Sequence, residues 1–232
     1  MSQAAAGVKA AVEAFREGSP VLVHDAADRE GETDLIYPAG AVTPEDVSRM
    51  RNDAGGLICV ALSDEVATAF DLPFLEETLD HPASAAHELG YDERSSFSLP
   101  VNHRDTYTGI TDEDRTTTIT ELAAAASEVQ STSNASGETA SAPTEIDFAA
   151  EFRAPGHIHL LRAAPDLLAD REGHTELGIA LAAAAGREPA VVVCEMLDDE
   201  TGEALAPEDA KAYAERHGLA YVEGSEVVEY VE

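Results

Sequence analysis

Short apolar runs and amphipathic stretches alternate irregularly along the chain, and polar or glycine-containing segments separate them. The apolar runs are typical of strands, which we expect at residues 21–24, 57–62, 97–102, 157–162, 190–196 and 219–222. The amphipathic or alanine-rich stretches predict helices near residues 3–17, 44–53, 112–126, 175–185 and 207–217. A short helix after Ser63 and a terminal helix complete the pattern. It predicts an α/β (α+β) fold in which helices cover one mixed β-sheet.

One helix has a well-defined start and end. Thr43 is a typical N-cap, Pro44 suits the first helical position, and the two acids that follow complement the helix dipole. Gly55 and Gly56 should end this helix before the next strand.

Residues 127–146 are small and polar and lack apolar periodicity, so they predict a loop. We interpret this segment as an insertion rather than a linker, because neither flanking piece has a self-sufficient set of strands. The chain is therefore expected to form a single domain over residues 1–232.

The charge balance is strongly negative, with 46 acids, 14 Lys or Arg residues and a net charge of −32. Such a surface repels phosphates, so general nucleic-acid binding is not expected. Only Lys9 and Lys211 are lysines, and the acids are spread along the chain, which favours a salt-adapted (halophilic) protein over a merely acidic one. No apolar run of about 18 residues and no signal peptide are visible, and Cys59 and Cys194 lie in apolar runs as expected of buried thiols. We expect a cytoplasmic protein that does not span a membrane.

The densest polar cluster, residues 24–34, directly follows an apolar strand. Its carboxylates could hold a hard cation such as Mg²⁺ or Mn²⁺, and Arg29 could bind an anionic substrate. A solvated acidic loop is the alternative interpretation, and such loops are the more frequent case in so acidic a chain.

Cations and histidines gather again between residues 153 and 176. Arg171 precedes Gly173 and a Thr175 that resembles an N-cap, which suggests a phosphate site at a helix N-terminus. His157, His159 and His174 accompany the arginines, although single histidines are more often structural. The motifs of P-loops, Rossmann folds, hydrolase elbows and zinc proteases are absent from the sequence. The residues alone predict a metal-assisted enzyme that acts on a small phosphorylated substrate.

At these clusters the sequence resembles the 3,4-dihydroxy-2-butanone 4-phosphate synthase family. The matching segments, in order, are DREGETDLIYPA from Asp28, RNDAGGLICVAL from Arg51, SSFSLPVNHRDTYTGITDEDRTTTI from Ser95, FRAPGHIHLLRA from Phe152, REGHTE from Arg171 and VVCEM from Val192. Together they cover nearly the whole chain, and their order and spacing make the resemblance specific.

The resemblance implies conversion of D-ribulose 5-phosphate to L-3,4-dihydroxybutan-2-one 4-phosphate and formate by a lyase that uses Mg²⁺ or Mn²⁺. It implies Glu30 and His174 as metal ligands, and His157 and Glu195 as catalytic residues, with Asp25 and Glu32 as acids in the same site. The substrate-binding positions that it implies are Arg29, Glu30, Asp34, Thr106, Thr111, Arg171, Glu172, Gly173, His174, Thr175 and Glu195. It also implies a homodimer in which both subunits contribute to each site.

Two alternatives stay open at this point. Another metal-dependent sugar-phosphate isomerase or aldolase would use similar residues, and a non-enzymatic cation-binding surface protein would use the acids alone. Because no GTP cyclohydrolase II-like sequence follows the match, we expect a monofunctional protein.

Overall fold

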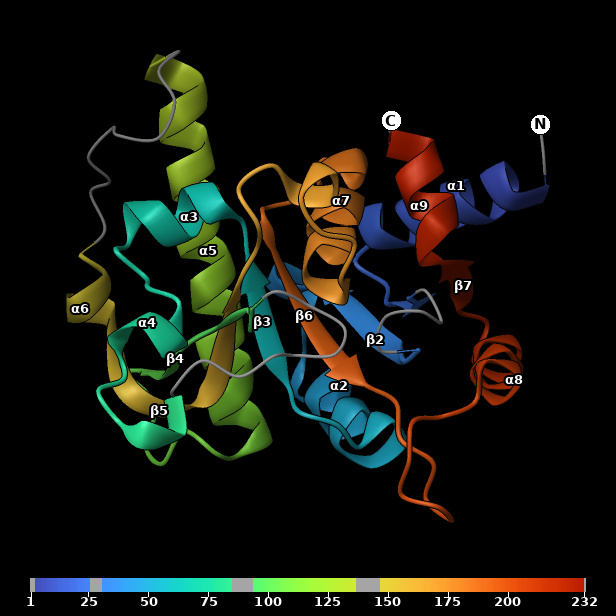
Figure 1. Cartoon of the computed structure of the whole chain (residues 1–232), viewed down its shortest axis with the longest axis horizontal. Helices are drawn as coiled ribbons and strands as arrows, with labels where there is room; N and C mark the ends of the chain where they lie inside the picture. Colours follow the sequence, from blue (N-terminus) through green and yellow to red (C-terminus); the bar gives the residue numbers. More distant parts are fainter. Residues whose placement is uncertain (1–2, 26–30, 85–93, 137–146, 232) are drawn as a thin grey trace.

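The computed structural model describes residues 3–25, 31–84, 94–136 and 147–231. Within them seven strands form one mixed sheet with the order β4-β5-β3-β6-β2-β1-β7 (Figure 1). The strands are β1 (Val21–His24), β2 (Thr33–Pro38), β3 (Cys59–Leu62), β4 (Phe97–His103), β5 (Phe152–Arg162), β6 (Ala190–Glu195) and β7 (Ala220–Glu223). The β1–β7 and β3–β5 pairs are parallel and the other pairs are antiparallel, which confirms the predicted mixed sheet.

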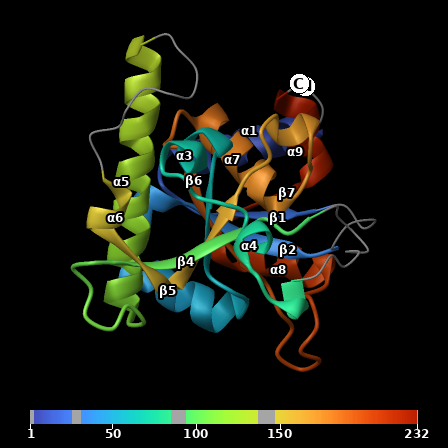
Figure 2. The ribbon, with the colours of Figure 1, turned by 60° about the vertical axis from the view of Figure 1, so that its left-hand side comes forward.

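Helices cover both faces of this sheet. They are α1 (Gln3–Arg16), α2 (Pro44–Arg49), α3 (Asp64–Ala69), α4 (Leu75–Thr78), α5 (Asp112–Ser136), α6 (Phe148–Glu151), α7 (His174–Ala185), α8 (Pro207–His217) and α9 (Gly224–Val231). Buried residues of α2, α3, α5 and α8 form one core with the sheet, whereas those of α1, α7 and α9 form a second core on its other face. Figure 2 shows α1, α7 and α9 gathered together and the long α5 standing apart from them. None of the described helices is both long and apolar enough to cross a bilayer.

Sheet register decides which side chains meet. Asp34 pairs with Glu195, and Cys59 pairs with both Val193 and His159. Because side chains alternate between the faces of a strand, these five residues all lie on the face covered by α7. The cavity described below opens on this face.

The predicted signals around α2 are confirmed. Thr43 accepts a hydrogen bond from the Asp46 N–H, and the Asp46 carboxylate accepts one from the Thr43 N–H, which makes a capping box. After α2 the chain forms a π-helical turn over Met50–Ala54, which ends at Gly55 with φ of 89°. A positive φ of this size favours glycine.

Two expectations about helix ends are wrong. The N-cap of α7 is Gly173, so Thr175 is the second helical residue rather than the cap. α5 continues to Ser136, so residues 127–136 are helical and not part of a loop. The helix continues because Val129 is buried against the core. The Ser131 and Thr132 hydroxyls are accommodated because they donate to the carbonyls four residues before them and not to backbone groups of a competing turn. Residues 137–146 of the predicted loop lie outside the described residues.

Strand β2 was not predicted, although it lies near the middle of the sheet and is buried throughout. Its apolar run is only Leu35 to Tyr37, between Asp34 and Pro38, which is too short to stand out from the polar segment before it. Asp34 is tolerated there because its side chain lies in the site described next.

Candidate active site

A cavity of about 100 Å³ opens on the α7 face of the sheet. Its sheet residues include Asp34, Cys59 and Glu195, and the start of α7 contributes His174 and Thr175. Arg171 and the segment 94–97, which leads into β4, complete the lining. Five of the predicted site residues therefore converge, although they come from three segments far apart in the sequence.

Glu195 is held at the end of β6 by the turn that follows the π-helix. Its Oε2 accepts a hydrogen bond of 2.8 Å from the Leu57 N–H, and its carbonyl accepts one of 3.0 Å from the Gly56 N–H. A Cβ on Gly56 would lie 2.4 Å from Oε2 of Glu195, so only glycine permits this close approach. The Gly-Gly signal in the sequence therefore positions a carboxylate as well as ending a helix.

His174 is buried, and its Nε2 lies 3.2 Å from the carbonyl oxygen of Val23. Nε2–H therefore donates to this carbonyl, which leaves the lone pair on Nδ1. Nδ1 lies 3.6 Å from Oδ1 of the buried Asp34. A metal-binding histidine typically donates its other N–H to a carbonyl in this way, and a carboxylate oxygen suits Mg²⁺ or Mn²⁺.

The donor chemistry at His174 thus fits the divalent cation that the resemblance implies. Across the described ranges, no group of three His, Cys, Asp or Glu side chains is arranged to hold a metal ion. Glu30, the second predicted ligand, lies outside the described residues, as does Arg29. The role of Glu30 as a metal ligand stays a prediction.

Arg171 is tied down at the rim of the cavity. Its guanidinium donates to Ser96 Oγ at 2.6 Å and to Glu176 Oε2 at 3.1 Å. The Glu176 side chain is fully buried, and its other oxygen accepts the Ala164 N–H at 2.9 Å. Burial raises the pKa of Glu176, and the opposing influence of Arg171 and the hydrogen bonds limits this rise.

Sequence reasoning did not single out Ser96 or Glu176 as site residues. Glu176 lies five positions after Arg171, beyond the helix start, where an acid is common for reasons of helix dipole alone. Ser96 precedes β4 and carries no distinctive pattern. Two further predicted residues follow Arg171 directly: Glu172 is exposed and Gly173 is buried.

Asp25 and Glu32 face each other at the base of the β1–β2 connection. Oδ1 of the buried Asp25 accepts the Glu32 N–H at 3.0 Å, and the Asp25 N–H donates to the Glu32 carbonyl at 3.1 Å. These bonds place both acids next to the strand ends from which Asp34 reaches the cavity.

Both cysteines are free and buried, as predicted. Burial raises the pKa of the Cys59 thiol, and the nearby Glu195 and Asp34 carboxylates raise it further. Burial likewise raises the pKa of Cys194. Cys59 is therefore a neutral thiol in the cavity wall and not an activated nucleophile.

A second group of predicted residues, Thr106, Thr111 and His157, lies at the antiparallel β4–β5 pair and the start of α5. We call this pair the hairpin, although α5 and α6 lie between its two strands in the sequence. His157 is exposed, and its backbone N–H donates to Asn102 Oδ1 at 2.8 Å. Thr106 is buried and donates its hydroxyl to the His103 carbonyl at 2.6 Å. Oγ1 of Thr111 accepts the Asp114 N–H at 3.1 Å, so Thr111 caps α5.

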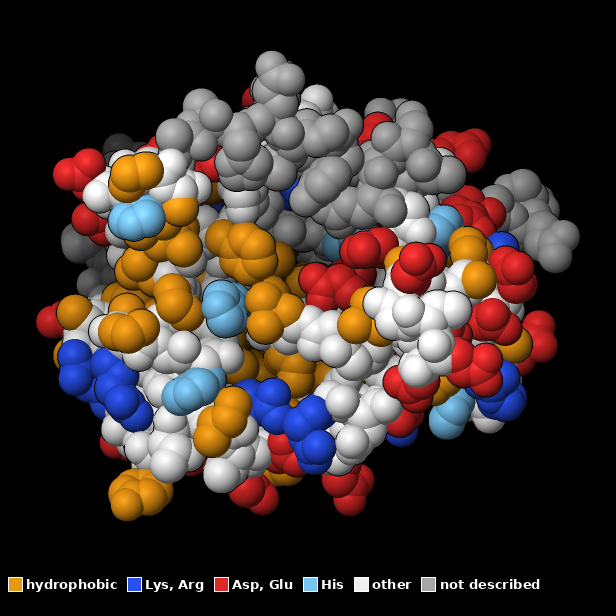
Figure 3. Space-filling view, turned by 60° about the horizontal axis from the view of Figure 1, so that its bottom comes forward, with side chains coloured by type: hydrophobic (Ala, Val, Ile, Leu, Met, Phe, Trp, Pro, Cys, Tyr) orange, Lys and Arg blue, Asp and Glu red, His pale blue; other side chains and the backbone are white. Residues whose placement is uncertain are grey.

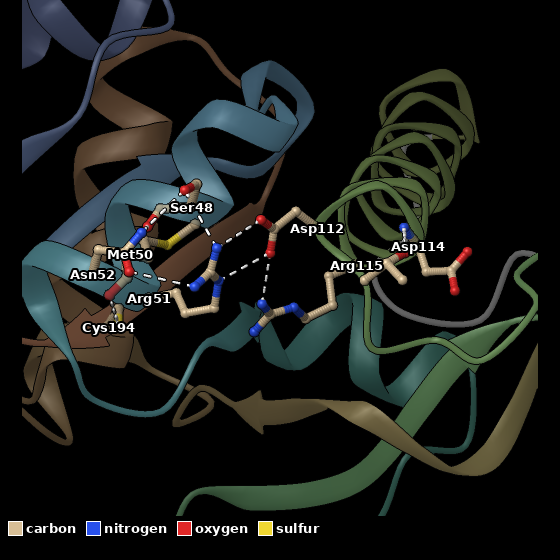
Figure 4. Close-up of polar contacts among 9 residues, drawn as sticks. Ser48, Met50, Arg51, Asn52, Asp112, Asp114, Arg115 and Cys194 are labelled. Atoms are coloured by element: carbon tan, nitrogen blue, oxygen red, sulfur yellow. Dashed lines mark hydrogen bonds and ion pairs between the residues drawn. The ribbon is translucent and has the colours of Figure 1, made fainter.

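The start of α5 is anchored to the π-helical turn (Figure 4). Arg51 donates from Nε and from one terminal nitrogen to the two oxygens of Asp112, at 3.2 and 3.0 Å, and Arg115 adds a bond of 2.9 Å to Asp112. The hydrogen bonds from Arg51 lower the pKa of Asp112. This arrangement connects the segment that holds Glu195 with the helix that Thr111 caps.

Within one chain no hydrogen bond or ion pair joins His157 and Glu195, the two residues that the resemblance implies as catalytic. His157 bonds to Asn102, whereas Glu195 bonds to Gly56 and Leu57. The predicted residues thus form two groups. The pocket group is Asp34, Arg171, His174, Thr175 and Glu195, and the hairpin group is Thr106, Thr111 and His157.

On one face of the molecule, hydrophobic and histidine side chains lie together at the surface (Figure 3). An open apolar groove of about 630 Å³ adjoins the cavity, with which it shares Ser95 and Phe97. Leu57, Leu79 and Phe97 line it and are 40%, 50% and 38% exposed. Isolated exposed apolar residues are ordinary, but a contiguous groove of them indicates an interaction surface.

Comparisons with known proteins assign the family. The sequence profile for 3,4-dihydroxy-2-butanone 4-phosphate synthase matches residues 9–230. A curated relative of that name from Archaeoglobus fulgidus is 47% identical over 226 residues, which cover 94% of this chain and 90% of the relative. Another relative of that name, from Methanosarcina mazei, is 46% identical over 232 residues, which cover 96% of this chain and 90% of that relative. The chain belongs to the 3,4-dihydroxy-2-butanone 4-phosphate synthase family.

Solved structures agree with this assignment. A 3,4-dihydroxy-2-butanone 4-phosphate synthase in complex with two magnesium ions has a TM-score of 0.78 and 30% identity, covering 97% of this chain and 96% of the other. The prediction of the family and of an enzyme is thereby confirmed, and another sugar-phosphate isomerase or aldolase is not favoured. The chain is a lyase of riboflavin biosynthesis, and the magnesium-bound relative fits the metal dependence of its reaction.

Proposed function

We propose that the cavity binds D-ribulose 5-phosphate with its phosphate at Arg171 and Thr175 and its sugar carbons toward His174 and Glu195. The observation that carries this proposal is the convergence of Asp34, Arg171, His174, Thr175 and Glu195 around one cavity. Arg171 and the N–H groups at the start of α7 attract an anion, in a protein whose net charge of −32 otherwise repels it.

Mg²⁺ or Mn²⁺ would be held by His174 and Glu30, with Asp34 beside them. A divalent cation in that position stabilises the negative charge that develops on substrate oxygens during the reaction. The Val23 carbonyl fixes the His174 ring so that Nδ1 keeps its lone pair on the side of Asp34.

Proton transfers fall to the carboxylates and to His157. The reaction needs proton abstraction next to a ketone, loss of a hydroxyl, a skeletal rearrangement and release of formate, so several acid–base groups are required. Glu195 is held through one carboxylate oxygen, which leaves the other for the substrate. Asp25, Glu32 and Asp34 are the candidates for the first base.

We also propose a homodimer in which each site takes the pocket group from one chain and the hairpin group from the other. Two observations support it. His157 and Glu195 are both essential in the proposed chemistry but do not meet within one chain, and an apolar groove adjoins the cavity. A second copy seated on Leu57, Leu79 and Phe97 would bury the groove and bring His157 of the partner subunit to the cavity.

Formate release tests the proposed reaction. The protein is incubated with D-ribulose 5-phosphate and Mg²⁺ in high KCl, with EDTA as the control, and we expect formate that depends on the cation. Isomerised pentose phosphate without formate would support an isomerase instead. Glu30→Gln should abolish cation-dependent activity, whereas unchanged activity would remove Glu30 from the ligand set.

Salt adaptation and a cytoplasmic location are further parts of the proposal. They rest on the excess of acids, on the scarcity of lysine and on two free buried thiols. Screening of surface repulsion predicts a melting temperature that rises with KCl concentration. A melting temperature that is flat or falls with KCl would contradict salt adaptation.

A further inference from the structure

Asn102, on β4, has no part in the reaction proposed above, but it contacts His157 directly. Its side chain is 1% exposed and lies against the segment that carries His157. Oδ1 accepts the His157 backbone N–H at 2.8 Å, and Nδ2 lies 3.5 Å from the Thr108 carbonyl. One buried amide therefore contacts both parts of the hairpin group, the histidine and the loop between Thr106 and Thr111.

The backbone contact fixes which end of the amide is which. If the amide were turned over, the His157 N–H would face an NH₂ group and lose its acceptor. With Oδ1 on that N–H, the His157 ring nitrogen Nδ1 lies 3.3 Å from Oδ1 and 3.2 Å from Nδ2. Nδ1 thus has an acceptor and a donor at nearly equal distance.

This geometry matters because an imidazole changes roles when it moves a proton. A neutral ring that takes up a proton at Nε2 must carry hydrogen on Nδ1, and the imidazolium that later releases this proton from Nε2 keeps the hydrogen on Nδ1. Oδ1 can accept from Nδ1–H in both states, whereas Nδ2 can donate only to the other neutral tautomer, which carries its hydrogen on Nε2. The ring can keep one orientation in each case.

We propose that Asn102 is a positioning residue whose Oδ1 accepts from Nδ1–H of His157, so that Nε2 can take up a proton and release it again without reorientation of the ring. The proposal rests on the proposed role of His157 in proton transfer. Asn102 would act through His157 and not by direct contact with the substrate.

The surroundings keep Asn102 and the loop in place. Gly109 has φ of 84°, and a Cβ there would lie 2.1 Å from Asn102 Nδ2, so the loop packs directly on the amide. The Asp114 carboxylate accepts the backbone N–H groups of Tyr107, Thr108 and Gly109 at 3.4, 3.1 and 2.8 Å. The loop is therefore held from both sides.

The charged and titratable groups near His157 are few. His159 lies two residues along the same strand, and burial and His157 lower its pKa. Arg153 donates to the Tyr107 carbonyl at 3.5 Å, and Asp114 is engaged by the loop. A new negative charge at residue 102 would be the nearest anion to Nδ1.

The test uses Asn102→Asp and Asn102→Ala in the full-length protein, with Asn52→Asp as the matched control. Among the described residues, the Asn52 side chain bonds to Ser48 and Arg51 alone, so its substitution adds the same charge away from the hairpin. Asn102→Asp retains the acceptor for the His157 N–H but offers no donor to Nδ1. It should favour Nδ1–H and raise the pKa of His157 by about one unit.

Two readouts decide the outcome. The acidic limb of the kcat profile against pH should move upward by about one unit in Asn102→Asp, and kcat should fall about tenfold in Asn102→Ala with KM nearly unchanged. Nitrogen chemical shifts of labelled histidine, assigned with His157→Ala, should show the Nδ1–H tautomer enriched in Asn102→Asp relative to wild type. The control should match wild type in both.

The tautomer measurement does not depend on activity, so it tests the role of Asn102 separately from the role of His157. Unchanged tautomer and pH profile in Asn102→Asp would overturn the role of Asn102, even if His157→Ala is inactive. Full activity of His157→Ala would instead overturn the proposed role of His157. If Asn102→Ala does not fold, Asn102→Asp and the wild-type shifts still decide the question.

Discussion

The pocket group and the hairpin group differ in how the fold holds them. The pocket group lies on paired strands and at the start of α7, where Asp34 and His174 are buried and fixed by backbone contacts. In the hairpin group His157 is exposed, and it is held by one buried amide. The difference teaches that one chain preorganises the part of the site at which we propose that the phosphate and the cation bind. The part proposed to transfer protons is exposed, so that a second surface could complete it.

The largest expected effects come from removing one histidine of each group. His157→Ala should lower kcat by about 10²–10⁴-fold, the usual contribution of a positioned acid–base group. His174→Ala should lower kcat to a similar degree, because it removes a proposed ligand of the catalytic cation. Formate assays give kcat, and equilibrium dialysis with Mn²⁺ gives cation binding. Only His174→Ala should weaken Mn²⁺ binding. Equal loss of Mn²⁺ binding in His157→Ala would remove the distinction between the groups.

A smaller effect is expected from the support beneath the pocket group. Arg171→Ala leaves the buried Glu176 carboxylate without its ion-pair partner, and this should cost about 3 kcal/mol of unfolding free energy at pH 7. In the double variant Arg171→Ala with Glu176→Gln, most of the loss should be recovered, because the amide can still accept the Ala164 N–H. Urea unfolding measures both.

The double variant is also a functional control. It should stay as poor in substrate binding as Arg171→Ala, because the phosphate contact is absent in both. If stability is not recovered in the double variant, the ion pair is not what supports Arg171.

The smallest effect concerns the anchor that joins the two groups. Arg51→Met removes the bidentate pair with the partly exposed Asp112 and should lower the melting temperature by at most about 4 °C at low salt. Arg51 lowers the pKa of Asp112, so this contribution is present above the ordinary Asp pKa of about 3.9 and is lost as pH falls through the lower folded value. Thermal scans from pH 7 to pH 3 measure it. A difference in melting temperature that does not shrink between pH 7 and pH 3 would exclude an ionic origin.

The sequence allowed most of the fold to be predicted where a local signal exists. Thr43, Pro44 and Gly55 mark their helix correctly, and the helix at Pro207–His217 is as predicted. β2 escaped prediction because Asp34 shortens the apolar run for the sake of the site, a conflict that only tertiary structure reveals. The end of α5 escaped because the Ser131 and Thr132 hydroxyls bond within the helix, although such residues usually favour loops.

For the site, the sequence indicated the clusters and the family resemblance indicated the residues. Neither reveals supporting contacts such as Glu176 on Arg171 or Asn102 on His157, since these form between segments that pack together only in the fold. Nor does the sequence show that His157 and Glu195 bond to different partners within one chain. These partners depend on sheet order and on the turn that fixes Glu195.

The most direct test of a site assembled from two chains is activity in a tagged heterodimer. One chain carries His157→Ala and the other His174→Ala, and each has a different affinity tag so that the mixed dimer can be isolated. If each site takes its pocket group from one chain and its hairpin group from the partner, one of the two sites is intact. About half of the wild-type formate production is then expected. A dimer of wild type with a chain carrying both substitutions should be inactive. The reverse pattern, an inactive first dimer and a half-active second one, would contradict the shared site.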